Sequence, residues 1–200
     1  MTAPSNTARG DIIATVKLPL SENTVRKMRS GQTVFLDGPI ITGRDEVHMR
    51  ALAGGEVPDC LKGAALYHCG PIMAKDGNGW KVIAAGPTTS ARMNSMAPEM
   101  IRRFGIRAVI GKGGMSDEVL EAMKEVGCVY LAAIGGAAVS LAECIRNVKG
   151  AEWHDLGMAE AMWKFETERF GPLTVAMDAK GNSLYKEVKL KADMILNDHS

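Results

Sequence analysis

Two spacings of apolar residues alternate along the chain. Short, nearly continuous apolar runs rich in β-branched residues are typical of strands, and they occupy residues 32–43, 64–73, 80–86, 106–111, 128–136 and 173–178. Apolar residues recur every three or four positions, as in amphipathic helices, in residues 22–29, 44–55, 94–105, 116–127 and 137–147. Apolar strands that alternate with amphipathic helices indicate a partly parallel sheet covered on both faces. We therefore expect one α/β domain with an additional antiparallel or barrel-like part near its N-terminal half.

Local signals predict where several of these elements begin and turn. Ser21 is suited to cap the helix over residues 22–29. Asp37-Gly38-Pro39 predicts a turn between two strands, and Asp76-Gly77 predicts a hairpin between residues 64–73 and 80–86. Gly181-Asn182 predicts a final hairpin after residue 178.

Length and charge limit the kind of protein this is. Two hundred residues suit one domain, which we expect over residues 18–200, after a partly ordered N-terminal segment, residues 1–17. Lys and Arg number 24 and Asp and Glu 23, so a net charge of +1 creates no general attraction to nucleic acid or to a membrane. The N-terminus lacks the pattern of a signal peptide and no apolar run is long enough to span a bilayer, so we expect a cytoplasmic protein.

The four cysteines give no sign of a metal site in this chain. Cys60, Cys69, Cys128 and Cys144 contain no closely spaced pair, which zinc and iron–sulfur sites usually show. We expect reduced cysteines that pack in or near the core, with no metal held by this chain.

The first turn with unusual chemistry is GRDEVH, residues 43–48, where a strand leads into a helix. Arg44 is a fork-shaped donor that suits a carboxylate, and helical spacing puts His48 one turn after Arg44 and Asp45. The alternative is an ordinary surface ion pair beside a solvated histidine.

The second turn is GPTTSARM, residues 86–93. Thr88, Thr89 and Ser90 offer hydroxyl and amide groups at a helix start, and Arg92 follows in its first turn. A capped turn with an incidental arginine would explain the same residues, although two threonines and a serine exceed what a cap needs.

The third turn is KGGM, residues 112–115. Lys112 follows a strand, and the two glycines after it let the backbone approach a ligand closely. The order of residues fits neither a phosphate-binding P-loop nor a dinucleotide fingerprint, so a plain tight turn is the alternative. No GxSxG motif supports a hydrolase.

Together, Arg44, Arg92 and Lys112 lie at strand-to-helix turns, where α/β sheets bind ligands. The three cations predict a pocket for a small dianion, and the Thr88 hydroxyl beside them is a candidate for proton exchange with the substrate.

These motifs, with YHCGPI and GMAEAMW…FGPLTVAMD, resemble the β subunit, or fused C-terminal domain, of the iron–sulfur-dependent class I fumarases and L-tartrate dehydratases. The resemblance runs from about Leu18 to about Tyr185. It implies a swivelling β/β/α domain, that is, an α/β fold with a mixed sheet or barrel-like core flanked by helices. It also implies a hydro-lyase that adds water reversibly to a C4-dicarboxylate such as fumarate. The [4Fe-4S] cluster, whose unligated iron acts as a Lewis acid, would belong to a partner α subunit.

Carried over to this chain, the resemblance gives each candidate residue a role. Arg44 and Arg92 would bind a substrate carboxylate, Thr88 would move the proton, and Lys112 would position the substrate or stabilise charge. Asp45 and His48 are expected to orient Arg44, and Thr89 and Ser90 are expected to shape the turn.

Three questions remain open at the level of sequence. The substrate is fumarate, L-tartrate or a methylated fumarate, or the chain is a non-catalytic dicarboxylate-binding module. The expected assembly is an α2β2 hetero-oligomer, with a homo-oligomer of this chain alone as the alternative. A methionine-rich segment with Met93, Met96 and Met100 either docks α or fills the core.

Overall fold

Five strands close into a barrel at the centre of the computed structural model, which describes residues 14–197. The barrel strands are β2 (Thr33–Thr42), β3 (Ala65–Tyr67), β6 (Ala108–Gly111), β7 (Val129–Ala133) and β9 (Met162–Met177). β2, β3, β6 and β7 run parallel, and β9 closes the barrel because it pairs antiparallel with both β7 and β2. The predicted mixed sheet with a barrel-like core is confirmed.

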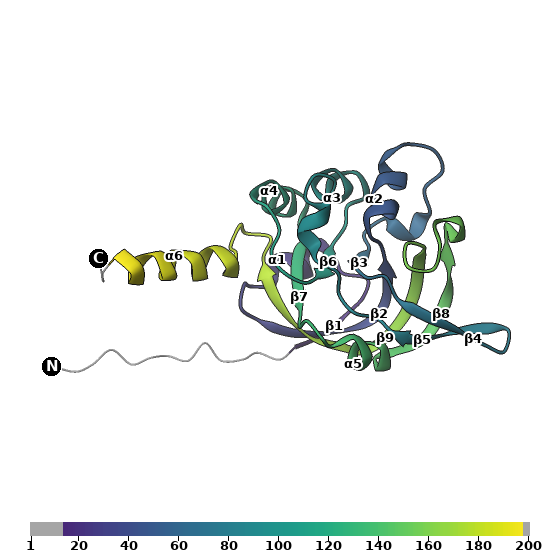
Figure 1. Ribbon diagram of the computed structural model, residues 1–200. Coiled ribbons are helices and arrows are strands. Elements are labelled where there is room, and N and C mark those ends of the chain that lie inside the picture. Colours follow the sequence, from purple (N-terminus) through teal and green to yellow (C-terminus); the bar gives the residue numbers. More distant parts are fainter. Residues whose placement is uncertain (1–13, 198–200) are drawn as a thin grey trace.

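Four further strands extend this core. β1 (Ala14–Lys17) pairs with β2, and β8 (Ile145–Glu152) pairs with β9. β4 (Ile72–Asp76) and β5 (Gly79–Ala84) form a separate hairpin, as the Asp76-Gly77 signal predicts, and this hairpin projects at the right of Figure 1. Of the predicted N-terminal segment 1–17, residues 1–13 lie outside the described residues.

Helices flank the barrel on two sides (Figure 1). On one side lie α2 (Asp45–Leu52), α3 (Ala97–Phe104) and α4 (Asp117–Val126), and on the opposite side lies α5 (Ala138–Glu143). α1 (Glu22–Lys27) starts at Ser21, whose Oγ accepts a hydrogen bond from Thr24 N, so the predicted cap is confirmed. Short 3₁₀ turns occupy Asp59–Leu61, Ser90–Met93 and His154–Leu156. α6 (Leu184–Asn197) extends away from the barrel.

The strands are apolar on both faces because they lie between two separate cores. The inner core fills the barrel with residues such as Leu36, Tyr67 and Phe170. The rings of Tyr67 and Phe170 meet edge to face, with 5.3 Å between their centroids. The outer core joins the barrel to α2, α3 and α4. Met93 and Met100 are buried in it and Met96 packs against it, so the methionine-rich segment fills the core and does not form a docking surface.

Three predicted elements are wrong, the first two because long-range pairing overrides a local signal. Asp37-Gly38-Pro39 makes no turn, since β2 runs straight through it and absorbs Gly38 at register shifts against β9. Residues 145–147 belong to strand β8, although their spacing predicts helix. At Gly181-Asn182 the chain turns back as predicted and makes one antiparallel bridge, Met177 to Ser183, but helix α6 follows in place of a second hairpin strand. The strand predicted over 64–73 is also divided between β3 and β4.

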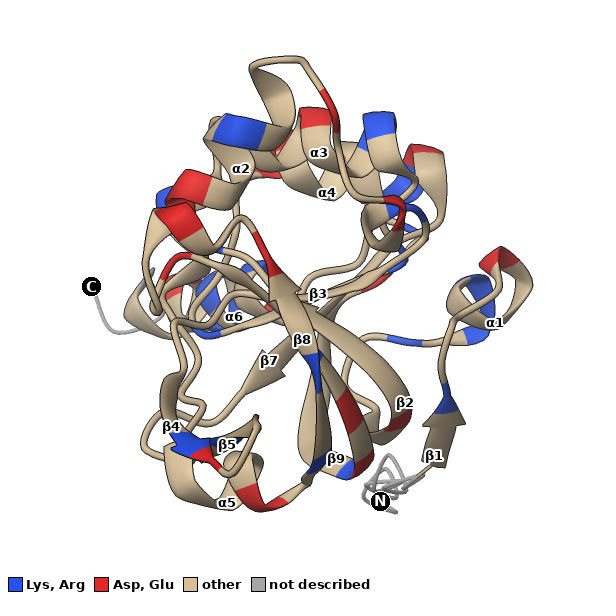
Figure 2. Cartoon of the chain, turned by 90° about the vertical axis from the view of Figure 1, so that its right-hand side faces the viewer, with Lys and Arg blue, Asp and Glu red and all other residues tan. Residues whose placement is uncertain are grey.

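The surface charge of the helical layer is mixed. Figure 2 shows acidic and basic residues interspersed over α2, α3 and α4, so no large surface of one sign forms there. Within residues 14–197, every helix falls short of the length and apolar character that crossing a membrane requires.

Candidate active site

The predicted site residues gather at one edge of the barrel because β2, β3 and β6 are parallel neighbours. Arg44 follows the carboxyl end of β2, and Lys112 follows that of β6. The loop with Thr88 and Thr89 runs beside the end of β6, where Thr89 pairs with Lys112 in an isolated parallel bridge.

Main-chain hydrogen bonds fix this loop on both sides. Thr88 N donates to His68 O at 2.7 Å, and Lys112 N donates to Thr88 O at 3.2 Å. Ser90 N in turn donates to Lys112 O at 3.0 Å. Thr88 is therefore held between β3 and the extension of β6. Its side chain is partly exposed, while Lys112 is exposed and Ser90 is fully buried.

Each arginine of the site forms an ion pair with a carboxylate. Arg44 Nε lies 3.1 Å from Glu160 Oε1, although the pair lacks the alignment of a hydrogen bond. Arg92 Nη2 lies 2.8 Å from Asp45 Oδ2. Asp45 thus pairs with Arg92, whereas the sequence led us to expect it to orient Arg44. That role falls to Glu160, which also accepts a hydrogen bond from Glu46 N at the start of α2.

A glycine makes room for the Arg44 side chain. A Cβ on Gly70 would lie 2.5 Å from Arg44 Nη1 and 2.8 Å from Ala159 O, both closer than real contacts allow. The Arg44 side chain therefore passes directly over Gly70, a position that only glycine fits.

Behind the exposed edge lies a group of buried polar side chains. Ser90 Oγ accepts a hydrogen bond from Tyr130 Oη at 3.0 Å and lies 2.8 Å from His68 Nδ1. His48 is buried as well, and its Nδ1 donates to Arg44 O at 2.8 Å. Burial lowers the pKa of His48, and burial together with the neighbouring His48 holds the pKa of His68 well below its usual value.

Sequence reasoning missed three of these residues, namely His68, Tyr130 and Glu160. His68 lies in the YHCGPI segment and Glu160 in the GMAEAMW segment, so the motifs that carry the family resemblance contain both. Tyr130 lies within an apolar strand and gave no comparable signal.

The cysteines of this chain do not fit an iron–sulfur cluster. Cys69 and Cys128 are buried in the inner and outer cores respectively, and burial raises the pKa of Cys69 to about 12. Thiolates, which cluster ligation requires, are therefore disfavoured. Within residues 14–197, no group of three His, Cys, Asp or Glu side chains is placed to hold a metal ion.

Comparison with known proteins connects this site to a family. The family model described as Fumarase C-terminus matches residues 3–188. A Methanocaldococcus jannaschii protein provisionally named L(+)-tartrate dehydratase subunit beta is 44% identical over 184 residues, which cover 90% of this chain and 94% of that protein. The L(+)-tartrate dehydratase subunit beta of Escherichia coli K12 is 35% identical over 172 residues, 86% of each chain.

A longer relative shows the same segment within a larger protein. A Geobacillus stearothermophilus protein provisionally named class I fumarate hydratase is 45% identical over 178 residues, which cover 88% of this chain. The chain spans only 34% of that protein's length. The match to the family model and the two β subunits matched over most of their length lead to one conclusion: this chain belongs to the Fumarase C-terminus family of hydro-lyases, which includes tartrate dehydratase β subunits.

Proposed function

We propose that this chain is the β subunit of a hydro-lyase that reversibly hydrates fumarate to L-malate, active only with a partner α subunit. The observation that supports this most strongly is the gathering of Arg44, Arg92, Thr88 and Lys112 at one edge of the barrel. The partner carries the [4Fe-4S] cluster, which supplies Lewis-acid chemistry. The expected assembly is α2β2, and the cytoplasmic location stays a prediction.

The residues of this chain divide the work of binding and proton transfer. Arg44 and Arg92 bind one carboxylate of the substrate, and Glu160 and Asp45 hold the two guanidinium groups in place. In hydration, the Thr88 hydroxyl delivers a proton to the carbon next to that carboxylate while water adds its hydroxyl group to the other carbon, and the proton that this water loses restores the threonine hydroxyl. In dehydration the same transfers run in reverse, and Thr88 takes the proton from carbon.

Positive charge lowers the cost of both steps. As the carbon gains or loses its proton, negative charge spreads onto the bound carboxylate, where the arginines stabilise it. Lys112 pairs with Thr89 in the loop that carries Thr88. It stabilises the threonine oxygen after that oxygen has given up its proton. The fixed loop contributes by holding Thr88 in one orientation.

L-tartrate dehydratase is the second candidate function, because the Methanocaldococcus and Escherichia coli relatives carry that name. L-malate, the hydrated form of fumarate, and L-tartrate differ by one hydroxyl group, and the two arginines bind either diacid. A non-catalytic dicarboxylate-binding module is the third.

The test is anaerobic turnover of fumarate, mesaconate and L-tartrate by this chain alone and then mixed with a cluster-bearing α subunit. Activity that requires the mixture establishes a β subunit, and the preferred diacid identifies the substrate. Light scattering of the purified mixture measures the stoichiometry. A loaded, assembled complex that turns over none of the three diacids contradicts the hydro-lyase proposal and favours the binding module.

Gly70→Ala is expected to raise KM for the diacid about tenfold, with a smaller change in kcat. The added Cβ displaces the Arg44 guanidinium by steric contact, so the carboxylate loses one well-aligned partner while the site keeps its charge. Steady-state kinetics of the assembled complex measure the effect. Gly135→Ala is the matched control, because nothing lies within 4 Å of its Cβ position. Equal KM values in both variants would contradict the placement of Arg44.

A further inference from the structure

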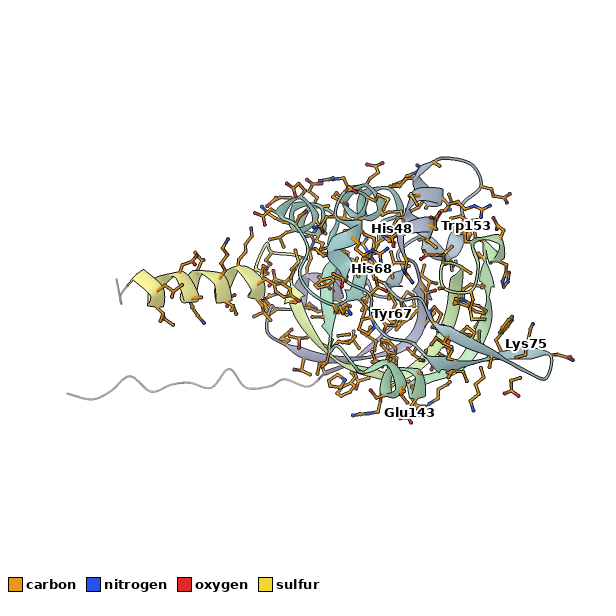
Figure 3. The ribbon with its side chains drawn as sticks, viewed as in Figure 1. His48, Tyr67, His68, Lys75, Glu143 and Trp153 are labelled. Carbon is orange, nitrogen blue, oxygen red and sulfur yellow. The ribbon has the colours of Figure 1, made fainter. Side chains whose placement is uncertain are left out.

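The buried polar side chains behind the site form one continuous row. Tyr130 Oη, Ser90 Oγ and His68 Nδ1 follow one another at 3.0 Å and 2.8 Å. The rings of His68 and His48 then meet edge to face with 5.2 Å between their centroids. His48 Nδ1 ends the row on the main-chain oxygen of Arg44. Figure 3 shows His48 and His68 one above the other in the interior of the molecule, below α2.

The donor and acceptor roles of these groups determine which ring nitrogens carry a hydrogen. The carbonyl of Arg44 can only accept, so His48 carries its hydrogen on Nδ1 and, when neutral, leaves Nε2 as an acceptor. At the other end Tyr130 donates to Ser90, and the hydroxyl hydrogen of Ser90 can in turn be donated to His68 Nδ1, which lies 2.8 Å away. Neutral His68 must then carry its hydrogen on Nε2.

The two remaining ring nitrogens lie inside the protein. Nε2 of His48 and Nε2 of His68 are both buried and make no hydrogen bond within the described chain. In the tautomers derived above, one of them is a donor and the other an acceptor. The two rings meet edge to face, and burial favours the neutral form of both by lowering their pKa values.

His68 is the residue where this row meets the proton-transfer loop. Its main-chain oxygen accepts the hydrogen bond of Thr88 N at 2.7 Å, and its side chain holds Ser90 two residues further on. Through His48 it also connects to the residue that precedes α2, Arg44. The side chain of His68 thus contacts Ser90, two residues after the proposed acid–base group, and the ring of His48, which bonds the main chain of a proposed carboxylate ligand.

We propose that His68 is a positioning residue that fixes Thr88 relative to Arg44 through this row of neutral, oppositely oriented tautomers. This inference rests on the proposed function, in which Thr88 transfers the proton. Displacing a proton donor by about 1 Å lowers the rate about 100-fold. The kcat of the complex therefore depends on a fixed distance between the Thr88 loop and α2. The arginines keep their charge whatever the row does, so substrate binding depends on it less.

The first test reads the tautomers directly and needs no activity. Long-range ¹H–¹⁵N correlation spectra of the full chain labelled with ¹⁵N-histidine distinguish the two neutral tautomers from each other and from the charged ring. The expected result at neutral pH is His48 with its hydrogen on Nδ1 and His68 with its hydrogen on Nε2. A His68 that is charged or carries its hydrogen on Nδ1 would overturn the proposal.

The second test measures the kinetic consequence in the assembled complex. His68→Asn keeps an amide near the Nδ1 position for Ser90 but removes the ring that contacts His48, so kcat should fall about 10-fold to 100-fold while KM changes less than about threefold. Tyr130→Phe, which removes only the first donor, should lower kcat by a smaller factor.

Thr167→Val is the control, because Thr167 is also a buried residue and its Oγ1 donates a hydrogen bond to Gly38 O at 2.8 Å that belongs to no part of the row. A comparable loss of kcat in this control, or a rise in KM alone in His68→Asn, would refute positioning. If the wild-type complex has no activity, the proposed function fails, and the tautomers alone decide whether the row exists as described.

Discussion

Thr88→Ala is expected to lower kcat of the α–β complex by about 10²-fold to 10⁴-fold, the usual contribution of a general acid–base group. The main chain of residue 88 is held by His68 on one side and Lys112 on the other, and alanine preserves both hydrogen bonds. The loop should therefore keep its shape and lose only the hydroxyl group. Anaerobic steady-state kinetics, with light scattering to follow assembly, measure both effects.

Thr88→Ser provides the matched control, since serine keeps a hydroxyl group at the same main-chain position. It should retain far more activity than the alanine variant. If Thr88→Ala separates the subunits while leaving turnover intact in the complex that still forms, residue 88 has an interface role, and the assignment of proton transfer is wrong.

Gly111→Ala is expected to lower the free energy of unfolding by about 1–3 kcal/mol and to lower activity with it, because the site of the new Cβ is already filled. That atom would lie 1.9 Å from Ser90 Oγ and 3.2 Å from Tyr130 Oη. Ser90 has no free space to move into, since it is fully buried. Urea denaturation of the chain alone measures the loss of stability.

Gly79→Ala is a suitable comparison for this variant. Gly79 is also a terminal residue of a strand, but its Cβ would meet only Asp76 O, at an ordinary 3.6 Å. It should change the unfolding free energy by less than about 1 kcal/mol. Equal stabilities of the two variants would show that Ser90 can be displaced without cost.

The positions of the candidate site residues could be predicted from the sequence because they depend on local order. Arg44 and Lys112 each follow a strand and precede a helix, and parallel strands place such turns at one edge of the sheet. The alternation of strands and helices was visible in the apolar spacing. Thr88 and Arg92 lie in the GPTTSARM turn, which the sequence also singles out, and the family resemblance then gave these residues their roles.

The partners of these residues could not be predicted, because ion pairs and buried hydrogen bonds depend on tertiary distances. Asp45 is the neighbour of Arg44 in the sequence, yet it pairs with Arg92, and Arg44 pairs with the distant Glu160. His68 lies within a strand-like run, where a buried histidine cannot be told from a solvent-facing one.

Turn signals failed where the barrel imposes its own geometry. Gly38 has φ of 120°, a conformation typical of glycine in a turn. Here it lies within strand β2, at a shift in the register of β2 against β9. Gly181 does lie in a turn after β9, and Ser183 forms one antiparallel bridge with Met177 before helix α6 begins at Leu184.

The central place of β9 has a consequence for the nascent chain. β9 joins β2, β7 and β8, although β2 leaves the ribosome more than a hundred residues earlier. During translation, the edges of β2 and β7 that pair with β9 stay unpaired until β9, which ends at residue 177, has been synthesised. Exposed strand edges of this kind invite association with other chains, so the protein is most vulnerable to misfolding before its last strand emerges.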